Sequence, residues 1–249
     1  MYVDDEEESE THENRKLEPS VVTKYLTDNY LFLTFGERQK EIYRYDEKMG
    51  IWKPDGRSFI ERNVQSYTPD KSKVNSHLVN EVISHIERET AGADRAIFES
   101  SAVPHLILLN GVLNLDTMTL EPFTPDYFML GRLNVTYNPE ADCPVFKQFL
   151  SEMLSPEDIR GVQEELGAIL AKDYKTKKFS IYLGPPNTGK TTFISVIQRF
   201  LGMENVSSVS IQNLASKNPF QVALYSEKWL IFGMICQKRL FIRQGNLRN

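Results

Sequence analysis

Hydrophobic residues recur at helical spacing in several stretches from about residue 20 onward. This spacing predicts helices around Val21–Leu26, Val74–Ile86 and Val145–Leu154. A further helix is expected to begin at Ser155-Pro156-Glu157-Asp158 and to continue to Leu170. Serine can cap a helix, proline suits its first position, and acidic residues favour its positive N-terminal end.

Two other stretches have the alternation and turn residues of β-hairpins. In Glu41–Trp52, apolar and aromatic residues flank a turn at Asp46–Gly50. In Leu106–Phe123, the dipeptide Asn110-Gly111 is a strong turn signal. Helices and strands together predict a fold of the α/β class.

A strand, a glycine-containing loop and a helix are predicted in sequence near residue 185. Phe179–Leu183 is a short β-prone run, and Thr191–Leu201 is a helical run that ends at Gly202. The residues from Gly184 to Thr191 read GPPNTGKT, which fits the P-loop pattern G-x4-G-K-[ST]. The loop and its flanking elements therefore predict a site for the phosphates of a nucleotide, with a plain glycine turn as the alternative.

The residue types of this loop suit polyphosphate chemistry. Gly184 and Gly189 are expected to adopt unusual dihedrals, so that backbone N–H groups converge on the phosphates. Lys190 is expected to contact the β- and γ-phosphates and is the catalytic candidate, while the Thr191 hydroxyl is expected to hold Mg²⁺. Thr192 is expected to cap or pack, or to touch the α-phosphate. The expected binding residues are Gly184, Pro185, Pro186, Asn187, Thr188, Gly189, Lys190, Thr191 and Thr192.

Charge is distributed unevenly along the 249 residues. Hydrophobic residues make up 41% and charged residues 25%, which is ordinary for a globular protein with a buried core. Residues 1–14 contain seven acidic and no basic residues, so removing them changes the net charge from −5 to −5 + 7 = +2. Residues 1–18 are therefore expected to form a disordered acidic tail, or a docking tail for a basic partner. A nearly neutral body gives little support for DNA binding by charge alone.

Other classes of protein are disfavoured by the sequence. The N-terminus has no basic segment followed by an apolar one, and the longest apolar run, Trp229–Cys236, is too short for a membrane helix. Two cysteines and four scattered histidines do not predict a metal site built from protein side chains alone. We therefore expect a cytoplasmic protein without a membrane partner.

The order and spacing of several motifs over most of residues 25–230 resemble the superfamily 3 helicases. The closest resemblance is to the helicase part of the phage, plasmid and poxvirus type primase-helicases. These motifs are Gly50-Ile51-Trp52, Asn110–Leu115, Tyr137-Asn138-Pro139 to Cys143-Pro144 with Phe146 and Phe149-Leu150, Glu164–Gly167, Gly184–Thr192, Leu201-Gly202, Leu214–Ser216 and Asn218–Leu224.

The resemblance implies an AAA+-like P-loop NTPase core, here truncated, preceded by a smaller α+β and helical region. The corresponding domains are residues 19–140 and 141–249, after the tail at 1–18. It further implies binding of ATP and Mg²⁺, and hydrolysis in a hexameric ring that moves on single-stranded or forked DNA during replication. Nothing in the sequence resembles the primase domain that precedes this region in such proteins.

The sequence departs from this family after Trp229. The family pattern places here a strand that ends in acidic residues, which hold the metal and orient the attacking water. Trp229–Gln237 is apolar enough for the strand, but Lys228–Asn249 contains five basic and no acidic residues. There is also no room for the later sensor residue, DNA-binding hairpin and arginine finger. We expect phosphate binding to survive, hydrolysis to be slow and unwinding to be absent.

A shifted reading frame would explain this ending. The codon of Met234 is ATG and that of Ile235 begins with AT, so the shifted frame reads GAT, an aspartate codon, across their junction. The alternative is a true short basic tail. The nucleotide sequence of the locus distinguishes the two, because only a frame slip leaves a continuation of the helicase in the shifted frame.

Three functions remain open from the sequence. The first is an ATP-binding helicase module of a phage- or plasmid-type replication protein, in an incomplete copy. The second is a non-catalytic replication protein that binds a partner through residues 20–150 and carries a vestigial P-loop. The third is another small P-loop NTPase or kinase, with an acidic residue such as Glu227 or Asp173 taking the place of the missing one.

Overall fold

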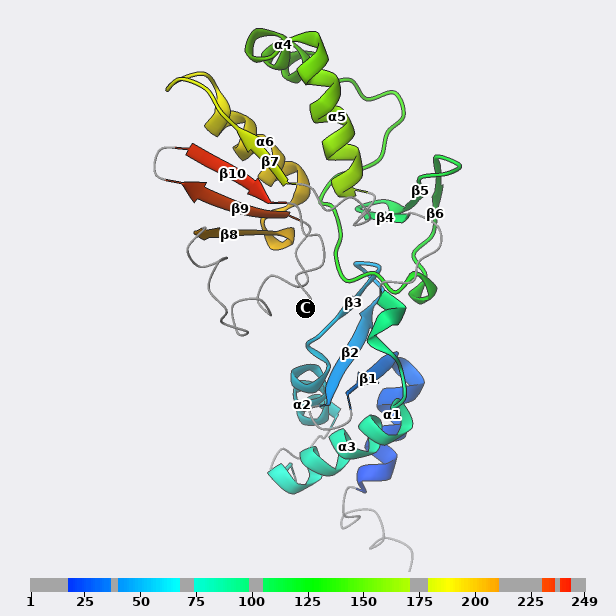
Figure 1. The fold of residues 1–249 in the computed structure, drawn as a ribbon. Helices are drawn as coiled ribbons and strands as arrows, with labels where there is room; N and C mark the ends of the chain where they lie inside the picture. Colours follow the sequence, from blue (N-terminus) through cyan, green and yellow to red (C-terminus); the bar gives the residue numbers. More distant parts are fainter. Residues whose placement is uncertain are drawn as a thin grey trace, which may run out of the picture. The chain divides into compact units, whose positions relative to one another are not determined.

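The chain forms two compact units, each of mixed helix and sheet (Figure 1). The computed structural model describes residues 18–36, 40–67, 74–98, 105–170, 179–210, 230–235 and 238–242. Unit 1 comprises residues 1–46 and 52–100, and unit 2 comprises residues 47–51 and 101–249. The α/β class agrees with the expectation. The expected domain boundary at residue 140 lies inside unit 2 and stays a prediction.

Unit 1 packs helices on a small sheet of order β1-β2-β3, in which β1 is antiparallel to β2. Its elements are α1 (Pro19–Asn29), β1 (Phe32–Phe35), β2 (Glu41–Asp46), β3 (Ile51–Lys53), α2 (Gly56–Tyr67), α3 (Ser76–Glu89) and the short helix η2 (Arg95–Phe98), although Ile51 at the start of β3 is assigned to unit 2. The expected helices at Val21–Leu26 and Val74–Ile86 are confirmed as α1 and α3, and the expected hairpin as β2–β3. The sequence pattern did not predict β1 or α2.

The core of unit 1 explains why its helices form where they do. Leu78, Val82 and Ile86 are buried along one face of α3. The Asn75 side chain caps this helix, because its Oδ1 accepts a hydrogen bond from the Leu78 N–H at 2.8 Å. The same apolar cluster contains residues of α1, α2, β1 and β2.

The first sheet of unit 2 has the order β4-β5-β6, with antiparallel pairing throughout. Its strands are β4 (His105–Leu108), β5 (Gly111–Asn114) and β6 (Thr119–Glu121), so the expected hairpin is confirmed and gains a third strand. Gly111 at the turn has φ +146°, and a Cβ there would lie 2.5 Å from the backbone oxygen of Glu121. Only glycine fits this position without a shift of the backbone.

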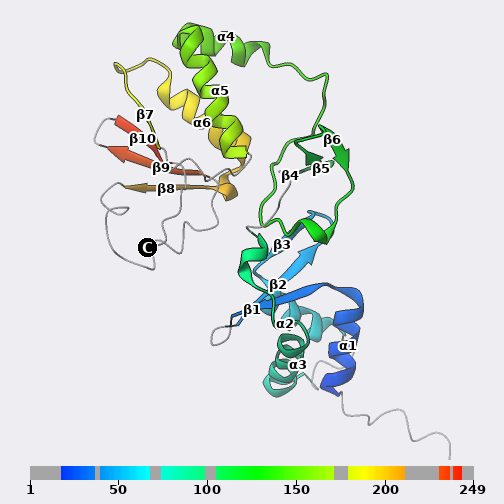
Figure 2. The same cartoon turned by 45° about the vertical axis from the view of Figure 1, so that its right-hand side comes forward.

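The second sheet of unit 2 has the order β7-β10-β9-β8. Its strands are β7 (Phe179–Tyr182), β8 (Val206–Ser210), β9 (Leu230–Ile235) and β10 (Lys238–Ile242). β8 is parallel to β9, while β10 is antiparallel to both β9 and β7. It follows that β7, β8 and β9 run in one direction and that β10 runs against them (Figure 2). The strand expected within Trp229–Gln237 is confirmed as β9.

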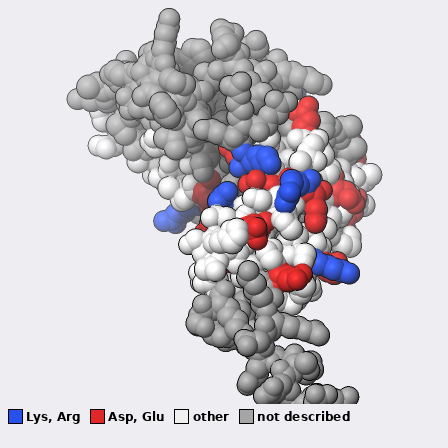
Figure 3. All heavy atoms as spheres, turned by 90° about the horizontal axis from the view of Figure 1, so that it is seen from below, with Lys and Arg blue, Asp and Glu red and all other residues white. Residues whose placement is uncertain are grey.

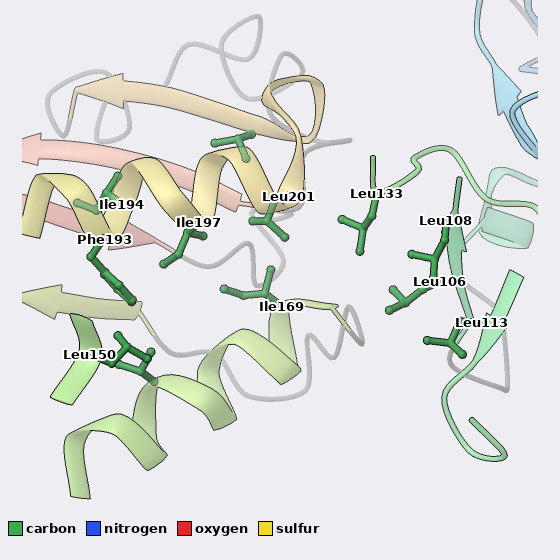
Figure 4. Packing of buried hydrophobic residues seen from close by; sticks show 12 residues of the cluster. Leu106, Leu108, Leu113, Leu133, Leu150, Ile169, Phe193, Ile194, Ile197 and Leu201 are labelled. Atoms are coloured by element: carbon green, nitrogen blue, oxygen red, sulfur yellow. The ribbon is translucent and has the colours of Figure 1, made fainter. Parts of the chain in front are cut away.

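Three helices of unit 2 share one hydrophobic core. They are α4 (Pro144–Met153), α5 (Pro156–Leu170) and α6 (Lys190–Leu201), with the short helices η3 (Pro125–Tyr127) and η4 (Met203–Asn205) elsewhere in the unit. Figure 4 shows Leu150 of α4, Ile169 of α5 and Phe193 of α6 directed into this interior. The Ser155 hydroxyl caps α5 as expected, accepting the Asp158 N–H at 3.2 Å.

Some sequence predictions fall outside the described residues. These are the acidic tail, of which only residue 18 is described, the motifs at Leu214–Ser216 and Asn218–Leu224, and the alternative acidic residues Asp173 and Glu227. Within the described residues, no helix is both long and apolar enough to cross a membrane.

Candidate phosphate-binding loop

The predicted site lies in the loop that joins β7 to α6. β7 ends at Tyr182 and α6 begins at Lys190, so the expected succession of strand, loop and helix is present. The residues from Gly184 to Thr188 are exposed, and Gly189 and Lys190 are half-buried. The structure thus brings all nine expected residues together in one loop and the first turn of one helix.

Gly189 turns the chain from the loop into the helix. It is the N-cap residue of α6 with φ +81° and ψ −3°, a left-handed conformation that favours glycine. Its carbonyl accepts the Phe193 N–H at 2.9 Å, which is the first hydrogen bond of the helix. Gly189 has no side chain to cap the first turn, and amides at this end of a helix have no partner within it. They are therefore available to an anion.

The expectation for Gly184 was wrong in one respect. Its φ is not in the left-handed region, where Asn187 is found instead with φ +61°. A Cβ on Gly184 would lie 3.4 Å from Thr188 Oγ1 and 3.5 Å from Lys190 Nζ, which are ordinary contacts. Asparagine tolerates the left-handed region better than most residues, so Asn187 provides the second unusual dihedral of the loop.

The Lys190 side chain folds back over the loop. Its ammonium donates hydrogen bonds to the carbonyls of Gly184 at 3.0 Å and Pro185 at 2.5 Å, and to Thr188 Oγ1 at 2.8 Å. The Thr188 hydroxyl in turn donates to the Pro185 carbonyl at 3.0 Å. An ammonium has three donors, so the loop engages all of them. The arrangement places a positive charge at the centre of the loop, beside the free end of α6.

Thr191 and Thr192 follow Lys190 in the first turn of α6, and both are exposed. The Thr191 carbonyl accepts a hydrogen bond from the Ser195 hydroxyl at 2.9 Å, as is common within helices. A hydroxyl is a suitable oxygen ligand for Mg²⁺ when phosphate oxygens and waters supply the others. The residues therefore fit phosphate well, and they offer Mg²⁺ one oxygen from Thr191.

The strand before the loop is tied to α5. The Tyr182 hydroxyl donates to Glu165 Oε2 at 2.6 Å, and the Tyr182 ring packs on Phe193 with 5.4 Å between centroids. Burial, together with this carboxylate, raises the pKa of Tyr182 well above its usual range. Tyr182 is therefore a neutral donor at physiological pH. It was absent from the sequence prediction because nothing local to it indicates a partner 17 residues away.

Acidic groups are missing from the strand that should provide them. Because β7 and β9 run in the same direction, their carboxyl ends lie at the same edge of the sheet. The residues from Leu230 to Gln237 contain no aspartate or glutamate. Among the described residues, no group of three or more histidine, cysteine, aspartate and glutamate side chains could hold a metal ion.

Charges of both signs are mixed on one described face of the molecule (Figure 3). Figure 3 shows lysine and arginine side chains interspersed with aspartate and glutamate on the face it presents. Arg44 Nε of β2 lies 2.9 Å from Oδ1 of Asp55, which follows β3, and Lys53 Nζ of β3 lies 2.7 Å from Asp46 Oδ2 of β2. Paired basic groups do not make the continuous positive surface that binds a phosphate backbone.

Comparison with known proteins assigns a family to the first part of the chain. A family model described as D5 N terminal like matches residues 23–155, which is 155 − 23 + 1 = 133 of the 249 residues. No curated protein matches the chain. The matched region runs from α1 through α4 and ends before α5, so the loop at Gly184–Thr191 lies outside it.

Proposed function

Since the chain belongs to the D5 N terminal like family of phage- and plasmid-type primase-helicase proteins, we propose that it binds ATP as part of a DNA replication helicase. Residues 184–192 are the proposed site for the phosphates. The resemblance to superfamily 3 helicases extends through this loop, which follows the matched region after α5.

The placement of Lys190 carries this proposal. Its ammonium is held over the loop by two carbonyls and a hydroxyl, next to the open N-terminus of α6. An anion at this position would therefore be attracted by two groups, the positive charge of Lys190 and the unsatisfied amides at the N-terminus of α6. A structural glycine turn would not need a lysine folded into its centre.

Lys190, the amides after Gly189 and the Thr191 hydroxyl have different roles in the proposed binding. Lys190 exchanges its hydrogen bonds to neutral loop oxygens for hydrogen bonds to phosphate oxygens, in which both partners are charged. The amides after Gly189 hold the phosphates from the side of the helix. The Thr191 hydroxyl is the proposed ligand for Mg²⁺, which, when bound, neutralises phosphate charge and fixes the geometry of the phosphate chain.

Binding and hydrolysis are expected to differ in this chain. Hydrolysis needs a group that orients water and completes the metal shell, commonly a carboxylate at a strand end. The strand that should provide it, β9, has none in Leu230–Ile235 or in the next two residues. We therefore propose tight nucleotide binding with slow turnover.

Titration of the full chain with ATP and ADP, in the presence of Mg²⁺, tests the proposal. Lys190→Ala should weaken binding by about tenfold to a hundredfold, since bonds to charged groups contribute about 1.5–3 kcal/mol. Arg199→Ala is the matched control, because Arg199 is an exposed cation in the last turn of the same helix. Equal nucleotide affinity of the two variants would show that the phosphate assignment is wrong.

A second assay addresses DNA. If the chain acts as a helicase module, single-stranded or forked DNA should stimulate any residual ATP hydrolysis. Stimulation by DNA would separate this function from that of a small kinase or NTPase. A folded chain that binds no nucleotide would instead favour a non-catalytic replication protein with a vestigial P-loop.

A further inference from the structure

We propose that α4 positions the phosphate-binding loop, with Phe149 and Met153 as the positioning residues. This role rests on the proposed nucleotide binding, and it makes the affinity for nucleotide depend on residues outside the loop. α4 lies within the region that matches the D5 N terminal like family, whereas the loop lies beyond it.

The contact between α4 and the loop is made at Gly189. A Cβ on this glycine would lie 3.1 Å from Phe149 Cε2 and 3.3 Å from Met153 Sδ. Phe149 and Met153 are four residues apart, so they lie on the same face of α4. An aromatic ring and a thioether therefore close the side of the loop at the residue where α6 begins.

α4 is itself fixed in the core that it shares with α6. Leu150 is buried and belongs to the same cluster as Phe193 and Ile197 of α6 (Figure 4). Phe149 and Met153 are half-buried and pack against this cluster. The first turn of α6 is thus held from two directions, by Phe193 in the core and by the α4 side chains at Gly189.

This bracing matters because amides must meet phosphate oxygens at defined distances. Hydrogen bonds of this kind weaken outside about 2.7–3.2 Å, so a shift of Gly189 by a few tenths of an ångström loosens several at once. Loss of the Phe149 ring would leave space into which Gly189 and the following amides can move. The structure therefore assigns to α4 a role in nucleotide affinity, in addition to its role in the core.

The decisive comparison is between two phenylalanines of α4. Phe149 touches Gly189, whereas Phe146 packs against the same core but is not among the nearest neighbours of Gly189. We expect Phe149→Ala to weaken binding of Mg-ATP to the full chain by about tenfold, and Phe146→Ala by much less. Both variants should lower the melting temperature without ligand to a similar extent, because both lose core packing. Phe149→Leu, which keeps an apolar side chain, should recover most of the affinity.

Met153→Ala provides a second variant that keeps the Phe149 ring in place. It should weaken Mg-ATP binding by about threefold, because only one of the two contacts at Gly189 is lost. Equal affinities of Phe149→Ala and Phe146→Ala, or an unchanged affinity of Met153→Ala, would overturn the role of α4. The proposed function would stand in that case as long as Lys190→Ala still weakens binding. If Lys190→Ala and the wild-type chain bind ATP equally, the proposed function fails, and the role of α4 fails with it.

Discussion

Replacement of Gly189 by alanine tests the loop and its support together. The new methyl group has two separate costs in the structure. At φ +81° a residue with a Cβ is strained by about 1–2 kcal/mol. The Cβ also lies 3.1 Å and 3.3 Å from Phe149 and Met153, and crowding of this kind costs about 1–3 kcal/mol. Together they predict a loss of about 2–5 kcal/mol of local stability.

Hydrogen exchange of the amides in Lys190–Leu201 measures this loss, because it reports the free energy of opening of one segment rather than of the whole chain. Gly167→Ala is the control. Gly167 lies in α5 and is exposed. Apart from the backbone of its own helix and its two chain neighbours, no heavy atom would lie within 4 Å of a methyl group added there. The same chemical change there should stabilise α5 by about 0.5–1 kcal/mol, because alanine is the better helix former.

The two costs at Gly189 can be separated with a second substitution. In a Phe149→Ala background the crowding against the ring disappears, while the backbone strain and the 3.3 Å contact with Met153 remain. Gly189→Ala should therefore cost less there than in the wild-type chain, but at least the about 1–2 kcal/mol of backbone strain. The reasoning is refuted if Gly189→Ala does not accelerate exchange in α6. It is refuted in part if Gly189→Ala lowers the stability of α6 by the same amount with and without Phe149. The Phe149 ring would then not restrict the space at Gly189.

Three further substitutions give separate outcomes. Thr191→Ala should reduce the Mg²⁺ dependence of ATP affinity about tenfold, and Thr191→Ser should restore it; titrations with and without Mg²⁺ measure both. Ser155→Ala should destabilise α5 by about 1 kcal/mol in hydrogen exchange, because the Asp158 N–H loses its cap. The Tyr127 hydroxyl donates a hydrogen bond to Glu121 Oε2 at 2.5 Å, and this bond lowers the pKa of the Glu121 carboxyl. The contact therefore stabilises the fold at pH values above the ordinary pKa of Glu121. This stabilisation is lost as the pH falls through the lowered pKa. Tyr127→Phe should therefore flatten the acid end of the pH–stability curve, measured by melting temperature from neutral pH downward, and an unchanged curve would contradict this.

The loop was predictable because its signal is local. Glycine, lysine and threonine at fixed spacing, between a β-prone and a helical run, required no knowledge of distant residues. The helix start at Ser155 and the turn at Asn110-Gly111 were predictable for the same reason. Each is a short pattern whose physical cause lies within four or five residues.

Two elements of unit 1 lacked such a signal. β1 is only four residues long, Phe32–Phe35, and three of the four are buried, so it has no alternation. α2 buries Gly56, Ile60 and Val64 at helical spacing, but most of its other residues are polar. Its burial depends on the sheet: a Cβ on Gly56 would lie 2.5 Å from the Ile42 carbonyl oxygen. Close approach of helix to strand selects this glycine, and a tertiary contact of this kind is not visible in sequence.

Non-local pairing also determines the sheet of unit 2. β10 pairs with β7 in a register that sets Arg239 opposite Tyr182, across a long stretch of chain. Scattered basic residues near Lys238 gave no indication of a strand. The support of the loop by α4 is hidden in the same way, since Phe149 and Gly189 are 40 positions apart in sequence and meet only after folding.

The parts of the site that bind and those that would hydrolyse are therefore determined by different features of the chain. The proposed binding depends on Lys190, on the left-handed Gly189, and on Phe149 and Met153 of α4, which pack against the core. Hydrolysis depends on groups at the carboxyl ends of strands, and β9 ends without a carboxylate. Lys190 is also the catalytic candidate, so its loss should affect both affinity and turnover. A substitution in α4 touches no catalytic candidate and should change nucleotide affinity without changing the turnover of bound ATP. The reverse should hold for an acidic residue introduced after β9, which would raise turnover while leaving affinity nearly the same.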